Sequence, residues 1–388
     1  MRVLFANERL GWFGGVEQNV ADTAHGLRGR GHECVLAFGA RTDRDPDGYA
    51  SNFASVQECR DLGGNGPPLA DIARDLRADA IYLHKIARIP ARSSFAREAR
   101  VVRYIHDHDL CCPRRHKYFA HNGRICEHPA GWRCWLDLAF IERGAAGIAY
   151  RHLPAHLDEM RANHGLDAFL VGSRFMREEL AMNGFPADRL RIVPPVVRRE
   201  ASAPTPPPDA PNVLFVGQLI RGKGVDLLLD ALALLGPAFR ARIAGTGNAD
   251  SALRERCAQL GLADRVEFLG WIANAELEAL YDWARVVAVP SRWAEPFGMI
   301  GLEAMRRARP VVACAAGGIP DWLVDGGTGI LCPVGDARAF AVALERVLGD
   351  QELAARMGGA AYLRGIGEYS FDRYLDRIEA ALGIGGGE

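Results

Sequence analysis

Short apolar runs alternate along the chain with stretches of helical periodicity. Residues 3–6 form the first apolar run. A glycine-bearing loop follows, and then Val16, Val20, Ala24 and Leu27 fall near one face of a helix. The runs lack clean polar alternation, which is typical of strands buried on both faces of a parallel sheet. In the first half we expect strands at 3–6, 35–38, 81–83, 101–105 and 169–171.

The second half repeats this strand–helix alternation. A helical pattern covers 225–235, and apolar runs predict strands at 213–216, 241–244, 266–269, 286–289, 311–313 and 329–331. The sequence therefore predicts an α/β protein with two doubly wound domains. Ligands of such sheets bind beyond the carboxyl ends of the strands. With two such domains, the expected site is the cleft between them.

A proline-rich segment separates the two halves. Residues 194–211 carry seven prolines and can continue neither a helix nor a central strand. We therefore expect an N-terminal domain over 1–195 on the acceptor side and a linker over 196–211. A donor-binding domain is expected over 212–368, followed by a C-terminal helix in 369–388 that packs back on the first domain.

Composition supports an ordinary enzyme of two domains. A length of 388 residues exceeds what one hydrophobic core usually supports. The net charge of -1 gives no global field for nucleic acid or membranes. No signal-peptide core or membrane-spanning run is visible, so a cytoplasmic location is expected. The nine cysteines are an odd, scattered set, which argues for reduced thiols rather than disulfides.

The most informative stretch runs from Glu295 to Glu303. Pro296 suits the opening of a helix, so the N–H groups of residues 298–300 are expected to form an anion site for a nucleotide diphosphate. Glu303 lies within that helix, where a buried carboxylate needs donors that ribose hydroxyls could supply. The alternative is that Glu295 is a charge at a helix terminus and Glu303 a solvated one.

This stretch resembles the E-x7-E signature of family 4 of the retaining glycosyltransferases, which have the GT-B fold of two facing Rossmann-like domains with an interdomain cleft. The likeness extends across nearly the whole chain. The other matching pieces, in order, are Gly14-Gly15-Val16-Glu17, Gly31-His32-Glu33, His106-Asp107, Gly217-Gln218-Leu219, Lys223-Gly224, Gly245-Thr246-Gly247, Pro290-Ser291, Gly317-Gly318-Ile319-Pro320 and Gly327-Thr328-Gly329.

The resemblance implies a retaining transferase that moves a sugar from a nucleoside diphosphate sugar, by default a UDP-sugar, to a carbohydrate or lipid-linked acceptor. Such a reaction would serve the synthesis of cell-surface polysaccharide or glycolipid, and it would need no metal or other cofactor. Two alternatives stay open. One is a nucleotide-sugar epimerase of the same fold, and the other is a catalytically degenerate scaffold that binds nucleotide sugars.

The resemblance also assigns roles to residues. Lys223 would neutralise charge on the departing diphosphate, His106 would contact the transferred sugar, and Glu295 would support positive charge at the anomeric carbon. These three are the expected catalytic residues. The expected donor-binding residues are Gly14, Gly15, Gln218, Arg221, Gly245, Phe297, Gly298, Met299, Ile300 and Glu303.

One position departs from the family pattern. Members usually carry an arginine where this chain has Gln218, which can donate a hydrogen bond but supplies no charge. Either Arg221 substitutes from the same loop, or stabilisation of the leaving group rests more heavily on Lys223 and the helix N-terminus. Both alternatives remain open.

Two D-x-D triplets could hold a divalent ion through carboxylate oxygens, namely Asp43-Arg44-Asp45 and Asp107-His108-Asp109. Such triplets arise often by chance, and the second half resembles a class that works without an essential metal. No metal ligand is therefore predicted among the site residues.

Residues 111–135 form an insert that is basic, aromatic and rich in cysteine. Its zinc-type residues lack the paired C-x2-C spacing of well-defined sites; with the nearby histidines they are Cys111, Cys112, Cys126, Cys134, His108, His116, His121 and His128. The mixture of arginine, lysine and tryptophan suits anionic lipid headgroups, which predicts peripheral contact with the inner face of a membrane. The alternative is a solvated loop anchored by a few aromatics. No nucleic-acid partner is expected.

Overall fold

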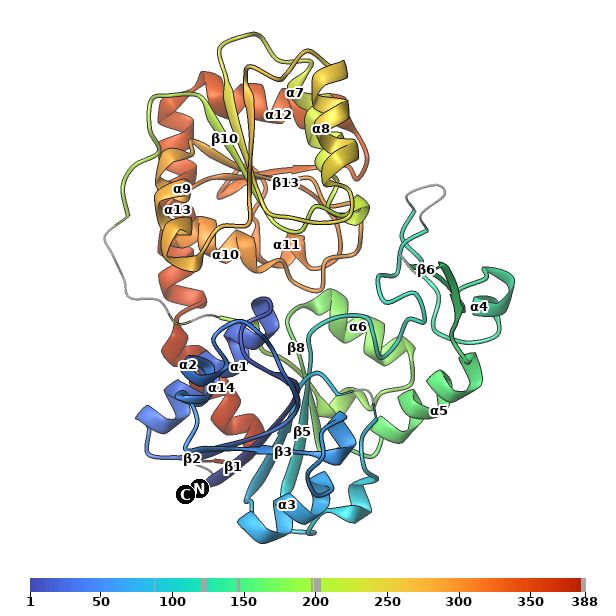
Figure 1. The fold of residues 1–388 in the computed structure, drawn as a ribbon. Coiled ribbons are helices and arrows are strands. Elements are labelled where there is room, and N and C mark those ends of the chain that lie inside the picture. The colour runs from blue at the N-terminus through green and yellow to red at the C-terminus, as the bar shows by residue number, and fades with distance from the viewer. Residues whose placement is uncertain (87, 120–123, 145–146, 197, 199–203, 385–388) are drawn as a thin grey trace. The chain divides into compact units, whose positions relative to one another are not determined.

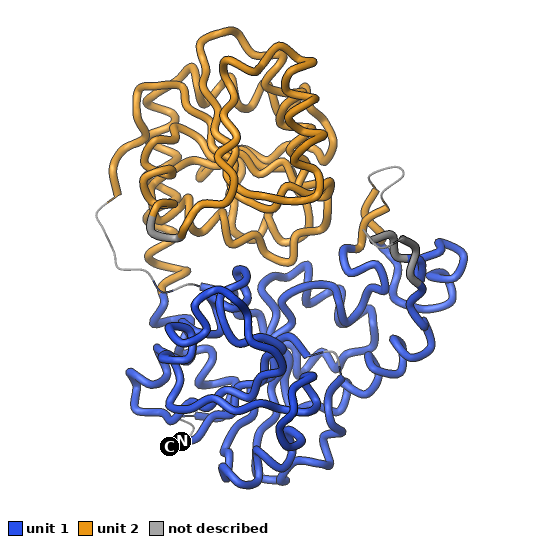
Figure 2. Tube along the Cα trace, viewed as in Figure 1, with its two compact units in different colours: residues 1–116, 127–199, 371–388 blue, residues 117–126, 200–370 orange. Residues whose placement is uncertain are grey.

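The computed structural model describes residues 1–86, 88–119, 124–144, 147–196, 198 and 204–384. The chain forms two compact units, shown in Figure 2. Unit 1 comprises residues 1–116, 127–199 and 371–388, and unit 2 comprises 117–126 and 200–370. Residues 197 and 199–203 of the predicted linker, and His121 of the insert, lie outside the described residues.

Unit 1 is built on a seven-stranded parallel sheet with the strand order β3-β2-β1-β4-β5-β8-β9. Its strands are β1 (Arg2–Leu10), β2 (Glu33–Arg41), β3 (Ser55–Glu58), β4 (Ala80–Leu83), β5 (Arg100–Ile105), β8 (Ala168–Val171) and β9 (Leu190–Ile192). The apolar runs that predict the central strands are buried on both faces. The strand order reverses between β1 and β4, which is where ligands of such sheets bind.

Helices cover both faces of the unit 1 sheet, with α1 and α14 on one side and α3 on the other (Figure 1). An antiparallel hairpin, β6 (Ile141–Gly144) and β7 (Gly147–Tyr150), belongs to the chain between β5 and β8. The helices of unit 1 are α1 (Gly15–Gly29), α2 (Pro46–Ala50), α3 (Leu69–Leu76), α4 (Arg133–Leu136), α5 (Leu153–Asn163), α6 (Arg174–Met182) and α14 (Phe371–Leu382), with the short 3₁₀ helices η1 (Arg60–Leu62), η2 (Arg92–Ser94) and η3 (Ala187–Arg189).

Helix α14 lies with α1 in unit 1, next to β4 and β5. The hydroxyl of Tyr374 is 2.7 Å from Thr23 Oγ1, and Asn19 Nδ2 donates to it at 3.1 Å. At the edge of the same contact, Arg30 Nη1 donates to Glu379 Oε2 at 2.6 Å. These contacts join a segment from the end of the described chain to the first helix.

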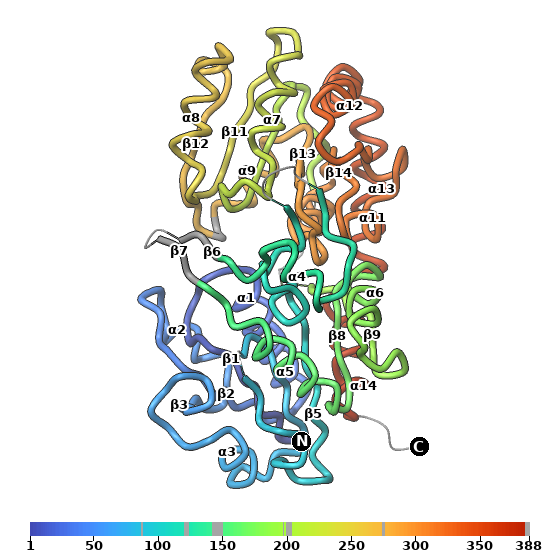
Figure 3. The backbone as a smooth tube through the Cα atoms, turned by 90° about the vertical axis from the view of Figure 1, so that its right-hand side faces the viewer, coloured from blue at the N-terminus to red at the C-terminus, as the bar shows by residue number. Residues whose placement is uncertain are grey.

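Unit 2 has a six-stranded parallel sheet with the order β12-β11-β10-β13-β14-β15, which reverses between β10 and β13. Helices α7, α8 and α12 cover one face and α9, α10 and α13 the other, as Figures 1 and 3 show. The strands are β10 (Asn212–Val216), β11 (Arg240–Ala244), β12 (Val266–Gly270), β13 (Val286–Val289), β14 (Val311–Cys314) and β15 (Gly329–Cys332). The helices are η4 (Arg221–Lys223), α7 (Val225–Leu232), α8 (Asp250–Gln259), α9 (Asn274–Trp283), α10 (Met299–Arg306), α11 (Ile319–Trp322), α12 (Ala337–Gly349) and α13 (Gln351–Glu368).

The two parallel sheets confirm the predicted α/β fold of two Rossmann-like domains. Strands β3 and β9 are not predicted, because their short, partly polar sequences contain no buried apolar run, and the hairpin is not predicted either. Unit 1 includes residues 371–388, which hold the expected C-terminal helix, whereas unit 2 includes residues 117–126, which the expected limits place in the first domain. Within the described residues, no helix combines the length and the apolar character needed to cross a bilayer.

Candidate functional site

In unit 2, two loops follow the strands at which the sheet order reverses. One follows β10 and carries η4; the other follows β13 and leads to α10. The backbone N–H groups of Arg292 and Trp293 both donate to the carbonyl of Gly222, at 2.8 and 3.1 Å. Gly224 has a φ of 70°, and a Cβ there would overlap the carbonyl oxygen of Pro290. Glycine at this position therefore allows the two loops to approach each other closely.

A buried ion pair joins these loops. Lys223 Nζ lies 2.8 Å from Glu295 Oε1 and 3.0 Å from Oε2, and Ser291 Oγ donates to Oε1 at 2.5 Å. The side chain of Glu295 is 4% exposed and that of Lys223 is 17% exposed. The ammonium also lies 4.9 Å from the centre of the Trp293 ring. The structure thus brings two predicted catalytic residues together, and the ammonium is the more accessible member of the pair.

Helix α10 begins next to this ion pair. Its N-cap is Gly298, in the left-handed region at a φ of 92°, and Met299 is its first residue. The expectation that Pro296 opens the helix is wrong, because the turn at Gly298 makes Met299, three residues later, the first helical residue. The N–H groups of the first turn have no partner within a helix, so Met299 and Ile300 present donors suited to an anion. Phe297 is buried, and its carbonyl accepts from Trp322 Nε1 at 2.6 Å.

Glu303 lies in the same helix and is half-buried. Its Oε2 accepts a hydrogen bond of 2.6 Å from the hydroxyl of Tyr281, which is fully buried at the end of α9. The protein therefore supplies a donor to this carboxylate. Sequence reasoning missed Tyr281, because a tyrosine within an amphipathic helix carries no local signal of such a contact.

The remaining predicted donor-binding residues lie in loops after strands or at the start of a helix. Gly245 directly follows β11 with a φ of 141°, and a Cβ there would overlap the carbonyl oxygen of Gly217. Gln218 and Arg221 are exposed in the loop after β10, which also carries Lys223. In unit 1, Gly14 and Gly15 are exposed at the start of α1. Gly14 has an extended backbone with a φ of −164°, and its N–H donates to Glu17 Oε2 at 3.0 Å.

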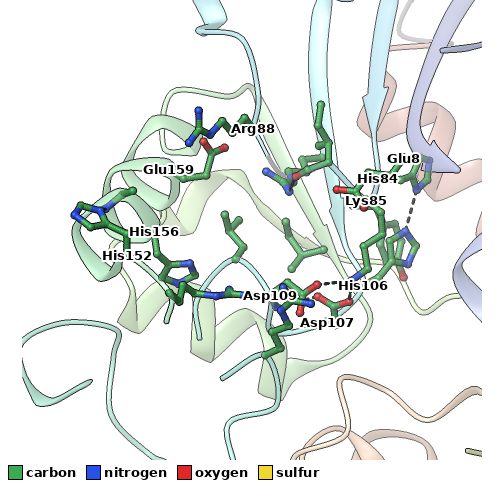
Figure 4. A pocket seen from close by; sticks show the side chains of 18 residues that line it. Glu8, His84, Lys85, Arg88, His106, Asp107, Asp109, His152, His156 and Glu159 are labelled. Atoms are coloured by element: carbon green, nitrogen blue, oxygen red, sulfur yellow. Dashed lines mark hydrogen bonds and ion pairs between the residues drawn. The ribbon is translucent and has the colours of Figure 1, made fainter. Parts of the chain in front are cut away.

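Unit 1 contains a cavity of about 430 Å³ at the carboxyl ends of β1, β4 and β5, shown in Figure 4. Charged side chains of both signs line it, among them Arg88, Arg103, Arg151, Asp107, Asp109 and Glu159. It lies at the point where the strand order of this sheet reverses, the usual ligand site of the fold. Hydroxyl-rich molecules suit such a lining because they donate and accept hydrogen bonds.

Two histidines meet at the wall of this cavity. His106 directly follows β5 and His84 directly follows β4, and His84 Nδ1 lies 2.9 Å from His106 Nε2. Burial lowers the pKa of His106 to about 3, helped by the charges of Lys85 and Arg103, and burial lowers that of His84 well below its ordinary value. Both rings are therefore neutral at neutral pH. Sequence reasoning missed His84, although it follows an apolar run just as His106 does.

Aspartates of both D-x-D triplets interact with other groups of the protein. Asp107 and Asp109 both pair with Lys85 Nζ, the latter at 2.6 Å. Burial alone would lower the pKa of Lys85, but the two carboxylates outweigh burial and raise it. Asp45 caps α2 by accepting from the N–H of Gly48 at 3.0 Å.

The insert 111–135 combines buried and exposed residues. Cys111, Cys112 and Cys126 are buried and form no disulfide. Trp132 is 68% exposed and Trp135 is 49% exposed. These three cysteines are thus packed inside the protein, while the two tryptophans of the insert face solvent.

Comparisons with known proteins match nearly the whole chain to two family models. The model described as Glycosyltransferase Family 4 matches residues 13–201, and the model described as Glycosyl transferases group 1 matches residues 197–364. A D-inositol 3-phosphate glycosyltransferase of Streptomyces griseus is 33% identical over 57% of this chain and 46% of its own length. An alpha-D-kanosaminyltransferase of Streptomyces kanamyceticus is 34% identical over 44% of this chain and 45% of its own. The chain spans about half the length of the curated relatives it matches.

Solved structures share the fold over almost the full length. HepE of Anabaena in complex with UDP is 21% identical, with a TM-score of 0.74 over 99% of this chain and 100% of that one. Sucrose-phosphate synthase from Thermosynechococcus elongatus is 19% identical, with a TM-score of 0.73 over 98% of this chain and 97% of that one. At these identities the likeness is one of fold.

Proposed function

The chain belongs to glycosyltransferase family 4, and from this premise we propose that it transfers a sugar from a nucleoside diphosphate sugar to a carbohydrate or lipid-linked acceptor. Unit 2 would bind the donor. A UDP-sugar is the donor we propose, since HepE, which shares the fold, was solved in complex with UDP and with UDP-glucose. The matched families and the named relatives are glycosyltransferases, which does not favour the epimerase alternative.

The observation that carries this proposal is the Lys223–Glu295 ion pair beside the N-terminus of α10. Departure of a nucleoside diphosphate builds negative charge on its phosphates, and fixed donors aimed at that charge lower the barrier most. Lys223 would supply the cation and α10 the backbone donors. Glu295 would hold Lys223 in place and contact the donor sugar. Glu303, already oriented by Tyr281, would accept from the ribose hydroxyls.

We propose that the reaction retains the anomeric configuration and needs no metal. Lys223 would take the part of a divalent ion in neutralising the leaving phosphates. Glu295 already accepts hydrogen bonds from Lys223 and Ser291, so a double displacement through this carboxylate is disfavoured. Attack from the same face, with the leaving phosphate assisting deprotonation of the acceptor, fits the arrangement better.

The cavity of unit 1 is the site that we propose for the acceptor. Its lining of acids and bases suits a polyhydroxylated molecule, and His106 at its wall would contact the transferred sugar as a neutral group. A neutral imidazole can donate or accept a hydrogen bond without opposing charge at the sugar. Transfer of a sugar to such an acceptor would serve the synthesis of a cell-surface polysaccharide or a glycolipid.

Thermal unfolding with a panel of nucleoside diphosphates and their sugars tests the donor site. A nucleotide that binds only the folded protein stabilises it by mass action and so raises the melting temperature. At a nucleotide concentration of 1,000 times its Kd, the gain in the free energy of unfolding is about 4 kcal/mol. We expect UDP compounds to stabilise the wild type, and Lys223→Ala and Glu303→Ala to weaken that effect. Glu267→Ala, an exposed glutamate of β12, is the matched control and should leave it unchanged.

Stabilisation by no nucleotide, with or without divalent metal, would show that the donor site is wrongly assigned. Product analysis with donor alone then separates the two enzyme classes. A transferase consumes its donor in the presence of an acceptor, whereas an epimerase converts the donor by itself.

We also propose that the insert makes peripheral contact with the inner face of a membrane. Among the described residues, large apolar side chains at the end of the insert and just after it are strongly exposed, namely Trp132, Trp135, Leu136 and Leu138. Tryptophan and tyrosine favour the headgroup region of bilayers. Vesicles with anionic lipid should co-sediment with the wild type and less with Trp132→Ala/Trp135→Ala. The control Trp271→Ala removes an equally exposed tryptophan of unit 2 and should have no effect.

A further inference from the structure

The structure assigns a transition-metal site of the zinc class to His108, Cys111 and Glu179 in unit 1. The three potential ligand atoms all lie within 4.8 Å of one another. All three residues are buried, with exposures of 0%, 1% and 4%. The inference is independent of the proposed function, because none of the three belongs to the proposed donor site.

The local backbone places two of the ligands on one side of a turn. His108 and Cys111 are three residues apart, and the N–H groups of Cys111 and Cys112 both donate to the carbonyl of His108, at 3.1 and 2.8 Å. This turn brings the imidazole and the thiol together. The ring of Phe175 packs edge-on against the imidazole of His108, with 5.9 Å between the two ring centres. This contact limits the rotation of the imidazole.

Helix α6 brings the third ligand. The helix is fixed at its start by Ser173, whose Oγ accepts from the N–H of Met176 at 3.1 Å. Glu179 stands in the second turn of the helix, with its carboxylate close to the other two groups. A rigid helix facing a tight turn can hold ligand atoms in a defined geometry.

The chemistry of the three groups selects the ion. A nitrogen, a sulfur and an oxygen ligand suit Zn²⁺, whereas Mg²⁺ and Ca²⁺ take oxygen alone. At zinc bond lengths of about 2.0 to 2.3 Å, tetrahedral ligands lie roughly 3.3 to 3.8 Å apart, so small side-chain rotations would close the site. A divalent ion would also balance the charge of a thiolate and a carboxylate in a buried place. Three protein ligands leave the fourth position for water.

The position of the site indicates what the ion does. Residues 107–116 form the loop after β5, and Asp107, Asp109 and Arg115 of this loop line the cavity of unit 1. An ion bound by His108, Cys111 and Glu179 would fasten this loop to α6. Its role would be to hold the cavity wall in shape. This inference departs from the expectation that the chain binds no metal.

Metal analysis of the full chain tests the site. The protein is produced with zinc in the medium and purified without chelator, and we expect about one zinc per chain in the wild type. Cys111→Ser, His108→Ala and Glu179→Gln should each weaken zinc binding at least about tenfold in competition with a chromophoric chelator. The matched control is Cys59→Ser, which makes the same change at another buried cysteine of the unit 1 core and should keep the zinc.

Cobalt substitution provides a readout that a merely misfolded variant would not mimic. Bound Co²⁺ should give a thiolate-to-cobalt absorption band in the wild type and in Cys59→Ser, and the band should be absent in Cys111→Ser. Circular dichroism identifies which variants remain folded. A wild type that binds no stoichiometric ion, or a folded Cys111→Ser that keeps the ion and the band, would overturn the assignment.

Discussion

At the scale of single residues, the ion pair between Lys223 and Glu295 would link stability to catalysis under the proposed function. Removing the cation with Lys223→Met leaves a nearly buried carboxylate with Ser291 as a donor. Breaking a fully buried pair costs about 3 to 5 kcal/mol, and the partial exposure of Lys223 places the expected loss below that range. Under the proposed function, turnover should fall about 100-fold or more, because Lys223 would be a donor to the leaving group.

The double variant Lys223→Met/Glu295→Gln separates the two effects. We expect it to recover part of the stability, since no unpaired charge remains, without recovering turnover. Urea unfolding and the rate of donor consumption measure the two quantities. Strict additivity of the two stability losses would contradict a direct interaction.

The buried His84 should make the protein sensitive to acid. Its pKa in the folded state lies well below the ordinary 6.5, so the unfolded state binds this proton more readily. The stability that comes from keeping His84 neutral in the folded state is fully present above pH 6.5. It is lost as the pH falls below that value, by about 1.4 kcal/mol per pH unit for one proton. His84→Phe should flatten this dependence in denaturant titrations from pH 7 to 5. His25→Asn, an exposed change on α1, should leave the slope as it is.

The sequence readily reveals a residue that directly follows a strand. It does not reveal which residue that side chain will contact. His106 is expected near a site because it follows an apolar run, and the pattern of β4 could have indicated His84 in the same way. The ion pair of Lys223 with Glu295 and the proximity of His108 to Glu179 bring together residues far apart in the chain. No periodicity encodes such pairs, because they depend on how the loops and helices pack.

At the scale of elements, two adjacent glycines of α13 have opposite surroundings. A Cβ on Gly358 would overlap the carbonyl oxygen of Ala308, whereas a Cβ on Gly359 would meet nothing within 4 Å. Gly359→Ala should stabilise the protein by about 0.5 to 1 kcal/mol through helix propensity. Gly358→Ala should destabilise it by about 2 kcal/mol, because α13 must move.

Each variant is the control for the other, since both make the same substitution in the same helix. The midpoint of urea unfolding gives the sign directly. Shifts of both variants in the same direction would mean that packing against Ala308 does not decide the outcome.

The elements themselves follow from the sequence where burial is complete. Central strands such as β4, β8 and β13 are short apolar runs buried along their whole length. The edge strand β3 alternates exposed and partly buried residues and contains a single apolar side chain, so hydrophobicity does not reveal it. The start of α10 was displaced from Pro296 because the left-handed turn at Gly298 sets the boundary.

At the scale of the whole molecule, the two units should respond separately to a change in one of them. Tyr374→Phe deletes the hydroxyl that contacts Thr23 and Asn19, which should cost unit 1 about 1 kcal/mol. Hydrogen exchange should therefore accelerate in β4 and β5 and stay unchanged in β10 and β13. Tyr150→Phe, at a 73% exposed tyrosine of unit 1, is the control. Equal acceleration in both units would contradict their independence.

The sequence predicts two Rossmann-like domains because each half repeats the same order of apolar runs. It does not assign residues 117–126 to unit 2, since that exchange depends on packing between segments distant in sequence. The cavity of unit 1 is equally invisible in the sequence. It forms where β1, β4 and β5 end side by side, and a cavity has no sequence pattern of its own.

The discontinuity of unit 1 has a consequence for the order of events on the ribosome. Residues 200–370 are synthesised between the sheet of unit 1 and the helix α14 that covers it. At about 5 to 20 residues per second, this interval lasts roughly 10 to 30 seconds. During that time β4 and β5, which carry the buried Tyr82 and Tyr104, lack the helix that lies against them in the finished protein. The nascent chain would therefore complete unit 2 before unit 1. Until α14 is synthesised, a chaperone could bind the face of the unit 1 sheet that this helix later covers.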